Sequence, residues 1–548
     1  MTTAPENISL PLQPQGFGEY DLPDGLSYKD ALKTQKIHYF CLLLIHGSIV
    51  ASLIVIYNVA LAAFPILAVA PLLMVPSVVH CIKNYFKYRA IENLPKPTRA
   101  LNLKPENFDL PKLNEFSKRD YSAHICQNSL ESNQWKLELL SHANHNIFLC
   151  GSYCGGPIFD EALHRIEQRM DLKQQLKTFI IASDYFLTEE NRNKLQYLQQ
   201  KYPERFHLHI FKENNDTINL ATDQWMLSVI HVKMCCIDYG KYFITGGSGL
   251  ETKWVNEETA AIPESADSGF HFSKTLVFPK YMNDMDFVFH SLNDRGIGGT
   301  IYLEMIKLFA MFDNCQDENS SISWQPSYTR LSFPCSQIDT RIPSYHASSL
   351  CSDLEIKPFV SEPQREDNPF LKRLIEQIDN ASSSIILNHM YFHPSPPLLN
   401  SLAEASKRGV KITIITNDQY EDSPVTHRFY ADFSKSQGLK LFNLGLPENI
   451  NFWLYRKSNT TDHKKVIIVD NLYTFVGSSN ISYRSDKTDY ELNLEVKSEI
   501  FAEKTAENIN ADLAFCEELP KTGNIYAPHS MLSHLKGTLQ KYIFSSIL

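Results

Sequence analysis

The 548-residue chain contains one spaced motif twice, which indicates a fold built from two related halves. The motif is H-x-K-x4-D, and the second copy lies 232 residues after the first at all three positions. Its residues are His231, Lys233 and Asp238, then His463, Lys465 and Asp470. Residues two apart on a strand point to the same face of a sheet, so each His–Lys pair is expected on one face. Chance placement of two unrelated surface pairs is a poor explanation of this repeat, because all three positions match.

Segments around the motif repeat as well. "ANHNIFLCGSY" (143–153) matches "ASSSIILNHMY" (381–391), and "KTFIIAS" (177–183) parallels "KITIITN" (411–417). Helical patterns separate these strands, and Gly409 follows the second such helix at the place of a C-terminal cap. Helical crossovers connect parallel strands, so we expect an α/β fold with a mainly parallel sheet.

A long apolar segment precedes the repeats. Residues Tyr39 to Cys81 include no Asp, Glu, Lys or Arg, and a spanning helix needs about 20 apolar residues. Lysines and arginines flank both ends, so the positive-inside rule favours a hairpin at 38–82 with both ends in the cytoplasm. Prolines at 65, 71 and 76 would kink or shorten its second arm. The alternative is a pair of buried core helices.

The remaining boundaries follow from the repeat. We expect a polar segment at 1–37, a linker at 83–125, lobes at 126–345 and 346–518, and a tail helix at 519–548. A net charge of −10 argues against a nucleic-acid partner. The eleven cysteines show no CxxC pairs, which indicates reduced thiols in a cytosol-facing body. No obligate protein partner is evident.

In the second copy, Gly477, Ser478 and Asn480 add the pattern GSxN after the motif. With these residues the chain resembles the phospholipase D superfamily, over about Cys126 to Phe515. The resemblance implies a two-lobed α/β/α sandwich in which both His–Lys pairs meet at a pseudo-twofold interface. Members that make cardiolipin add two N-terminal membrane helices, and the apolar segment is similar to these. It also resembles segments of bacterial proteins inserted into host vacuole membranes.

The residue types suit phosphodiester chemistry. A neutral imidazole can attack phosphorus to give a phosphohistidine, and a protonated one can donate to the leaving alcohol and later deprotonate the acceptor. By family analogy His231 is the nucleophile and His463 the general acid. Lys233 and Lys465 would neutralise the phosphate oxygens. No metal-ligand spacing adjoins either motif, so we expect neither a metal nor a cofactor.

Other residues would support this site. Ser248, Ser478 and Asn480 are candidate phosphate donors. Glu491 in the second copy and Asp284 in the first, with Asp286 as rival, are candidate carboxylates that orient the histidines. Asp238 and Asp470 complete the motif, but we favour a structural role for both, bracing turns at the lobe interface.

The first copy departs from the pattern of the lipid synthases. Gly249 stands where that pattern has Asn, and a polar insertion at 251–269 is either a gate or a surface loop. Four aromatic residues near the motifs line an apolar entrance or belong to the core: Trp254, Tyr391, Trp453 and Tyr455.

These features favour a membrane-anchored phospholipase D-like phosphodiesterase or phosphatidyltransferase that acts on phospholipids in the bilayer through a phosphohistidine. The acceptor would be water or an alcohol, phosphatidylglycerol included, as in cardiolipin synthesis. The body would face the cytoplasm at a bacterial inner membrane or, alternatively, lie at a host vacuole membrane. A membrane-tethered nuclease and a membrane organiser with a weakened site are the alternative functions.

Overall fold

A computed structural model describes residues 113–117, 121–151, 153–183, 186–211, 230–251, 254, 281–291, 297–313, 350–361, 368–418, 425–458, 460–487 and 489–521. The predicted polar segment, hairpin and tail helix lie outside these residues, except for the first three residues of the tail, 519–521. Among the described residues, no helix is both long and apolar enough to cross a membrane.

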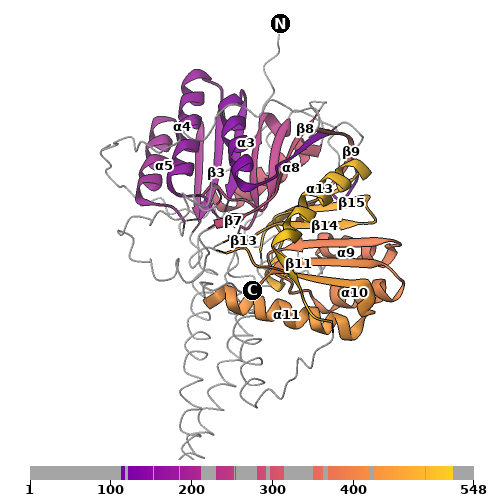
Figure 1. The fold of residues 1–548 in the computed structure, drawn as a ribbon. Helices are drawn as coiled ribbons and strands as arrows, with labels where there is room; N and C mark the ends of the chain where they lie inside the picture. Colours follow the sequence, from indigo (N-terminus) through magenta and orange to yellow (C-terminus); the bar gives the residue numbers. More distant parts are fainter. Residues whose placement is uncertain are drawn as a thin grey trace, which may run out of the picture.

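Two lobes follow one another along the chain (Figure 1). The first contains β1 (Tyr121–Ile125), α3 (Ser129–His142), β2 (Asn146–Gly151), α4 (Gly156–Leu172), β3 (Lys177–Ser183), α5 (Glu189–Lys201), β4 (Phe206–Phe211), β5 (Lys233–Ile237), β6 (Tyr242–Gly246), β7 (Tyr281–Asn283), β8 (Asp286–Ser291) and α8 (Ile297–Asp313). The predicted linker at 83–125 thus contributes β1.

The second lobe contains β9 (Leu350–Ser361), α9 (Pro369–Asn380), β10 (Ser384–His389), α10 (Pro396–Lys407), β11 (Lys411–Asn417), α11 (Val425–Leu444), β12 (Ile450–Tyr455), β13 (Thr460–Asp462), β14 (Lys465–Val469), β15 (Tyr473–Gly477), α12 (Tyr483–Lys487), β16 (Glu491–Lys497), α13 (Glu499–Asp512) and β17 (Cys516–Glu518).

One continuous sheet joins the lobes. Outward from its centre, the first lobe contributes β1, β8, β6, β5, β2, β3 and β4, while the second contributes β9, β16, β15, β14, β10, β11 and β12. β1 and β9 pair antiparallel at the centre, and β17 adds to the outer edge of β12. Apart from β17, each of these strands therefore has a counterpart at the same place in the other lobe, as a duplicated sequence requires.

The expectation of a mainly parallel sheet is wrong. Within the described residues, four of the sheet's fourteen strand pairings are parallel, namely those within β2–β3–β4 and β10–β11–β12. The motif strands β5 and β14 instead return through tight hairpins into β6 and β15. Asp238 and Tyr239, and likewise Asp470 and Asn471, have φ between 51° and 57°, the left-handed backbone that a tight hairpin turn favours.

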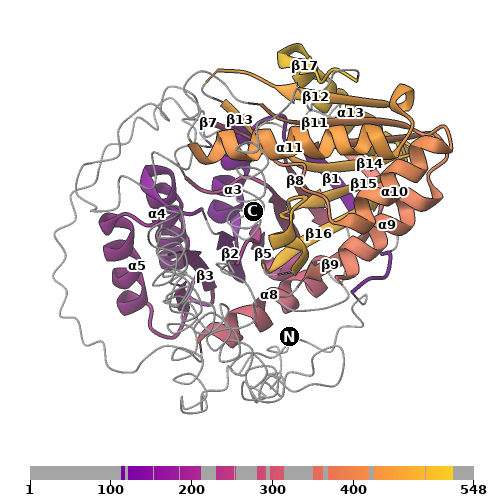
Figure 2. The same cartoon turned by 90° about the horizontal axis from the view of Figure 1, so that it is seen from below.

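Helices cover both faces of the sheet in each lobe. In the first lobe, alternate residues of β2 pack against α3, α4 and α5 on one face and against α8 on the other. In the second lobe, α9 and α10 cover one face and α13 the other (Figure 2). This alternation gives the layered α/β/α arrangement.

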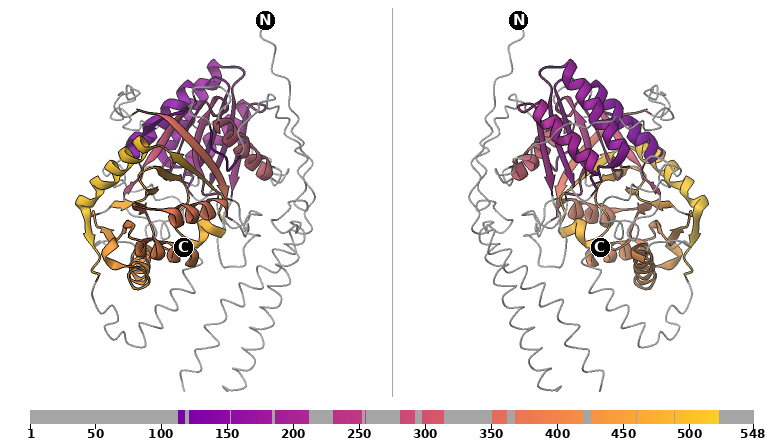
Figure 3. Two further views of the ribbon diagram at one scale, coloured as in Figure 1. Left: turned by 90° about the vertical axis from the view of Figure 1, so that its right-hand side faces the viewer. Right: turned by 90° about the vertical axis from the view of Figure 1, so that its left-hand side faces the viewer.

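A hydrophobic core shared by both lobes holds them together. The Phe501 ring of α13 lies 5.4 Å from the Phe287 ring and 6.3 Å from the Phe289 ring of β8, between centroids. Figure 3 shows from two sides that the lobes lie directly against each other. Because the interface is apolar and packed, it can hold residues from both lobes in a fixed geometry.

Candidate active site

Backbone pairing across the lobes brings the two motifs to one place. β7 of the first lobe runs parallel to β13 of the second, with Asn283 opposite Asp462. The His463 N–H donates to the Asn283 carbonyl at 2.7 Å, so Asp284 and His463 follow side by side.

A matching contact lies on the other side of the pseudo-twofold. Ile230 bridges Tyr490 in parallel, and the His231 N–H donates to the Tyr490 carbonyl at 3.0 Å. Glu491 and His231, the residues that follow Tyr490 and Ile230, therefore lie side by side, one from each lobe.

Each histidine is consequently braced by a carboxylate from the opposite lobe. Nδ1 of His231 lies 2.9 Å from Oε1 and 3.1 Å from Oε2 of Glu491. Nδ1 of His463 lies 2.5 Å from Oδ2 of Asp284. Of the two rival carboxylates, Asp284 is thus the one that contacts a histidine. With Nδ1 engaged as a donor, Nε2 is the nitrogen left for chemistry on each ring, and Nε2 of His463 lies 3.3 Å from Nζ of Lys465.

The two lysines lie beside their histidines, as the two-residue spacing predicts. Nζ of Lys233 donates to the His231 carbonyl at 2.8 Å, and Nζ of Lys465 to the His463 carbonyl at 2.7 Å. The Tyr153 ring lies 6.4 Å from both imidazole rings and 5.1 Å from Nζ of Lys233. A single ring that touches both halves shows that the two motifs form one site.

The site is buried and brings two lysines close to two carboxylates. Burial, with the neighbouring lysines, lowers the pKa of His231 and of His463 well below the usual value. Burial lowers the pKa of Lys233 to about 7 and that of Lys465 to about 8, although Asp284 and Glu491 oppose both shifts. Burial also raises the pKa of Asp284 and of Glu491. An anion bound between the lysines would favour their charged forms.

Comparison with known proteins agrees with this arrangement. Residues 374–513 match the family model described as cardiolipin synthase, PLD-like domain. Cardiolipin synthase 1 of Staphylococcus epidermidis is 26% identical over 168 residues, 31% of this chain and 32% of that protein. Cardiolipin synthase B of Escherichia coli is 24% identical over 163 residues, 30% of this chain and 36% of that protein. The matches thus span about a third of these relatives' length.

The fold is similar to a solved structure over most of the chain. The crystal structure of phosphatidylserine synthase from Haemophilus influenzae matches with a TM-score of 0.55 at 14% identity, covering 80% of this chain and 98% of that one. The second lobe is thus similar in sequence to phospholipase D-like domains, and the fold as a whole is similar to that of this synthase. The two half-sites of this chain can therefore be compared position by position within this fold.

The half-sites of this phospholipase D-like chain hold their carboxylates differently. Glu491 accepts hydrogen bonds from the hydroxyls of Ser478 and, at 2.7 Å, Ser485. Asp284 accepts from Nε1 of Trp254 at 3.2 Å and from the Met285 N–H at 3.0 Å. Trp254 precedes Ser485 by 231 residues. The offset between the two copies falls from 232 to 231 after the motif hairpin, because its turn is one residue shorter in the second copy. An indole thus replaces a hydroxyl.

A buried lysine outside the motif completes the first half-site. Lys136 donates to the carbonyl and hydroxyl of Ser248 at 2.7 and 2.9 Å and lies 2.8 Å from Oδ2 of Asp286. Ser248 also donates its hydroxyl to Asp286. At the matching positions of the second lobe, an uncharged residue replaces Asp286: Asn493 bonds Ser479. The sequence analysis does not identify Lys136, because it lies about a hundred residues before the motif.

The predicted phosphate donors are engaged with protein groups in this structure. The hydroxyls of Ser248 and Ser478 bond Asp286 and Glu491. The Asn480 N–H donates to the Ser485 hydroxyl at 2.9 Å, while its buried Oδ1 has no partner among the described residues. These residues therefore build the turns beneath the histidine–carboxylate pairs.

Gly249 has a structural reason to differ from Asn480. A Cβ at Gly249 would lie 2.5 Å from the carbonyl oxygen and from Cβ of Tyr153. The glycine thus allows Tyr153 to approach the two histidines. Most of the predicted insertion at 251–269 lies outside the described residues.

The motif aspartates brace turns within their own lobes. Asp238 accepts from the N–H groups of Asn144 and His145 at 2.8 Å each. Asp470 accepts from three consecutive N–H groups, those of residues 382–384, at 2.8 to 3.1 Å. The bracing role agrees with the sequence interpretation, but the partners of both residues belong to the turns before β2 and β10.

The predicted aromatic residues occupy different places. Trp254 is buried, with its ring 5.5 Å from the His463 ring. Tyr391 stacks on His393 at 5.6 Å. Trp453 packs against the shared core, and Tyr455 lies 6.1 Å from Phe515. Trp254 therefore adjoins a motif histidine, whereas Trp453 and Tyr455 belong to the packing of β12.

Three groups of the site have the spacing of metal ligands. Atoms of His231, Asp489 and Glu491 lie within 4.8 Å of one another. Asp489 pairs with Arg484 at 3.0 Å, and Glu491 already accepts from two hydroxyls and from His231. The carboxylates of Asp489 and Glu491 therefore already interact with protein donors in this arrangement.

Proposed function

We propose that this protein is a membrane-anchored phospholipase D-like phosphodiesterase and phosphatidyltransferase. The observation that carries the proposal is the pair of cross-braced histidines, His231 with Glu491 and His463 with Asp284, beside two buried lysines. One neutral imidazole, one imidazole able to carry a proton and two cations are the groups that a double displacement at phosphorus requires.

The first step is attack by His231. Its Nε2 forms a bond to phosphorus while the bond from phosphorus to the head-group oxygen breaks, and His463 gives its proton to that oxygen. The negative phosphate between the lysines raises the pKa of His463 again, so substrate binding itself favours the proton there. Lys233 and Lys465 stabilise the charge on the non-bridging oxygens.

The second step reverses the first with another alcohol or with water. The acceptor gives its proton to His463, its oxygen bonds phosphorus, and the phosphorus–nitrogen bond breaks to restore His231. Glu491 and Asp284 keep the imidazoles in the correct tautomer and stabilise their cationic forms.

A phospholipid is favoured over a nucleic acid as substrate. The apolar segment from Tyr39 to Cys81 fits a membrane hairpin, and the net charge of −10 is opposite to that of most nucleic-acid binders. The matched relatives are named cardiolipin synthases. We therefore propose transfer to an alcohol acceptor, phosphatidylglycerol included, in addition to hydrolysis.

The test is incubation of the full-length protein with mixed phospholipids, with and without glycerol, followed by mass spectrometry of all lipid products. Phosphatidic acid would indicate hydrolysis, and phosphatidylglycerol or cardiolipin would indicate transfer. The His231→Asn protein is the matched control. Cleavage of DNA with no change in any lipid would instead support the membrane-tethered nuclease, and inactivity toward both would support a membrane organiser.

The anchoring is tested separately. Deleting residues 39–81 should move the protein from the membrane to the soluble fraction while it still unfolds cooperatively. If the full-length protein is soluble without detergent and the shortened one aggregates, the segment is a pair of core helices instead.

A further inference from the structure

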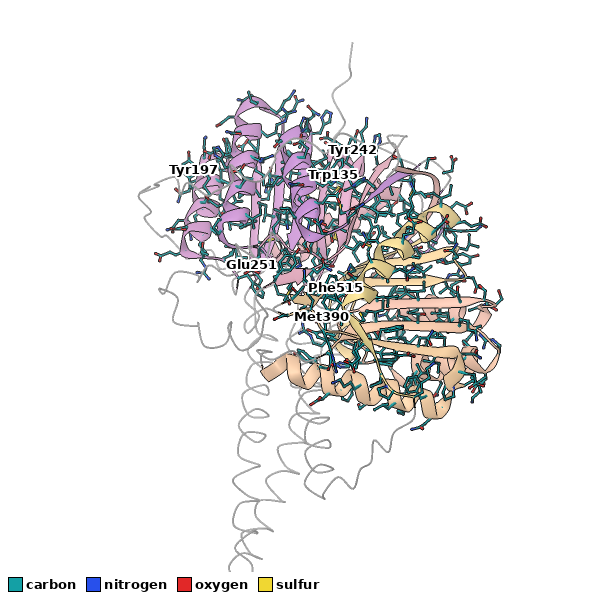
Figure 4. All side chains as sticks on the ribbon, viewed as in Figure 1. Trp135, Tyr197, Tyr242, Glu251, Met390 and Phe515 are labelled. Atoms are coloured by element: carbon teal, nitrogen blue, oxygen red, sulfur yellow. The ribbon has the colours of Figure 1, made fainter. Side chains whose placement is uncertain are left out.

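A third imidazole adjoins the active site. His389 is the last residue of β10 and lies directly opposite Lys465 in the antiparallel register of β10 and β14. Side chains of directly opposed residues lie on the same face of a sheet, so the His389 ring shares its face with the catalytic lysine. Figure 4 labels the next residue, Met390, where the two lobes meet.

This imidazole is buried without a partner. His389 is 4% exposed, and neither ring nitrogen has a hydrogen-bond partner among the described residues. A polar group buried in this way destabilises a protein unless some other group satisfies it. The motif histidines, by contrast, each have a carboxylate on Nδ1. The free nitrogens of His389 therefore indicate a ligand.

The feature belongs to one half-site alone. The residue opposite Lys233 in the first lobe is Gly151, at the matching end of β2. A Cβ there would lie 2.8 Å from Sγ of Cys154, so a ring at this position would have to displace that thiol. His389 is consequently not part of the duplicated set of two histidines and two lysines, and its place beside Lys465 needs a separate explanation.

We propose that His389 binds the hydroxyl of the alcohol acceptor, and the same oxygen of the departing head group, on the side of the site that His463 serves. This inference rests on the proposed function. In-line attack by His231 directs the leaving oxygen away from that residue, toward His463 and Lys465. His389 comes from the same lobe and faces Lys465 across the two strands.

The chemistry of the ring fits a hydroxyl. A neutral imidazole has one N–H donor and one lone pair, and a hydroxyl group likewise both donates and accepts. Burial and the nearby Lys465 lower the pKa of His389 well below its usual value, so the ring remains neutral. His389 accepts no proton in the reaction. It holds the acceptor oxygen while His463 removes the proton and the oxygen bonds phosphorus.

The test uses full-length His389→Ala and His389→Gln proteins with phosphatidyl-p-nitrophenol as donor and glycerol as acceptor. The nitrophenolate departs unaided, so its burst reports attack by His231 alone. We expect the burst to remain within about twofold of wild type. The KM for glycerol should rise about tenfold in the alanine variant, as when one hydrogen bond to a buried group is lost. The products should shift from phosphatidylglycerol toward phosphatidic acid, and glutamine should restore part of the glycerol affinity.

His290→Gln is the matched control, because that imidazole stacks on Tyr242 at 4.2 Å in β8; its kinetics should equal those of wild type. Unchanged glycerol KM values with an intact burst would overturn this inference while leaving the proposed function in place. A burst lost in both His389 variants would also overturn it, because His389 would then serve the first step. A wild-type protein that releases no nitrophenolate would overturn the proposed function and the inference with it.

Discussion

Glu491 of the second lobe accepts a hydrogen bond from Nδ1 of His231 of the first lobe at 2.9 Å. The exchange is reciprocal, because Asp284 of the first lobe is bonded to His463 of the second. Neither lobe therefore contains a complete histidine–carboxylate pair. The candidate active site therefore depends on an intact lobe interface.

Replacing Glu491 with Gln should lower kcat by about 10²–10⁴-fold, because the amide neither fixes the tautomer of His231 nor stabilises its cation. Stopped-flow or steady-state assays with a lipid substrate would measure this. Glu499→Gln, at the exposed start of α13, should leave kcat unchanged. A Glu491→Gln protein with wild-type kcat and an intact fold would contradict a role for the cross-lobe pair.

The pH dependence of kcat/KM should show a falling limb between about pH 7 and 8. Burial, with the neighbouring Lys465, lowers the pKa of Lys233 to about 7, and burial lowers the pKa of Lys465 to about 8. Only the protonated amines attract the phosphate, so kcat/KM should be highest below this range and fall as the pH rises through it. Lys233→Arg should move the limb to higher pH, even if its activity is lower, because a guanidinium stays charged. A profile that is identical in both proteins would exclude Lys233 as the source of the first fall.

Gly249→Asn should destabilise the protein, although it restores the residue that the second copy has as Asn480. The new side chain would collide with the backbone of Tyr153, and overpacking of this kind costs about 1–3 kcal/mol. Thermal or denaturant unfolding would measure the loss. Gln175→Asn, in an exposed turn after α4, is the control and should leave the stability unchanged. Equal stability of the two variants would contradict the predicted clash.

Chelation should leave the activity largely intact. Glu491 and Asp489 already bond Ser485 and Arg484, and the lysines supply the positive charge at the phosphate. Activity assays with and without EDTA on the full-length protein would test this expectation. Complete loss of activity that one divalent ion restores would assign a metal to the His231, Asp489 and Glu491 group.

Much of the site follows from sequence periodicity. The two-residue spacing of His231 and Lys233 and the repeat offset predict two equivalent strand ends, and the structure has them as β5 and β14. The sheet direction does not follow, because a helix between strands indicates parallel neighbours but says nothing of where the motif hairpin inserts. Aligning the repeat beyond the turn would have matched Trp254 with Ser485, a signal that was present in the sequence.

The cross-lobe contacts could not be predicted in this way. β7 and β13 are three residues long each, and Asp284 is 179 residues from His463. Pairing of such short segments depends on how the two lobes pack, which local patterns do not encode. The unpartnered ring of His389 likewise becomes visible only once β10 and β14 are placed in register.

The most direct test of the account compares phosphoenzyme formation in His231→Asn and His463→Asn proteins. The substrate is an aryl phosphodiester, whose leaving group needs no proton, and the product is detected as acid-labile phosphohistidine by mass spectrometry. The account predicts covalent phosphoenzyme in the His463 variant, none in the His231 variant, and loss of turnover on natural phospholipids in both. Phosphoenzyme in the His231 variant alone would assign the nucleophile to His463. Wild-type turnover in both variants would contradict the central claim, because the paired histidines would then not form the active site.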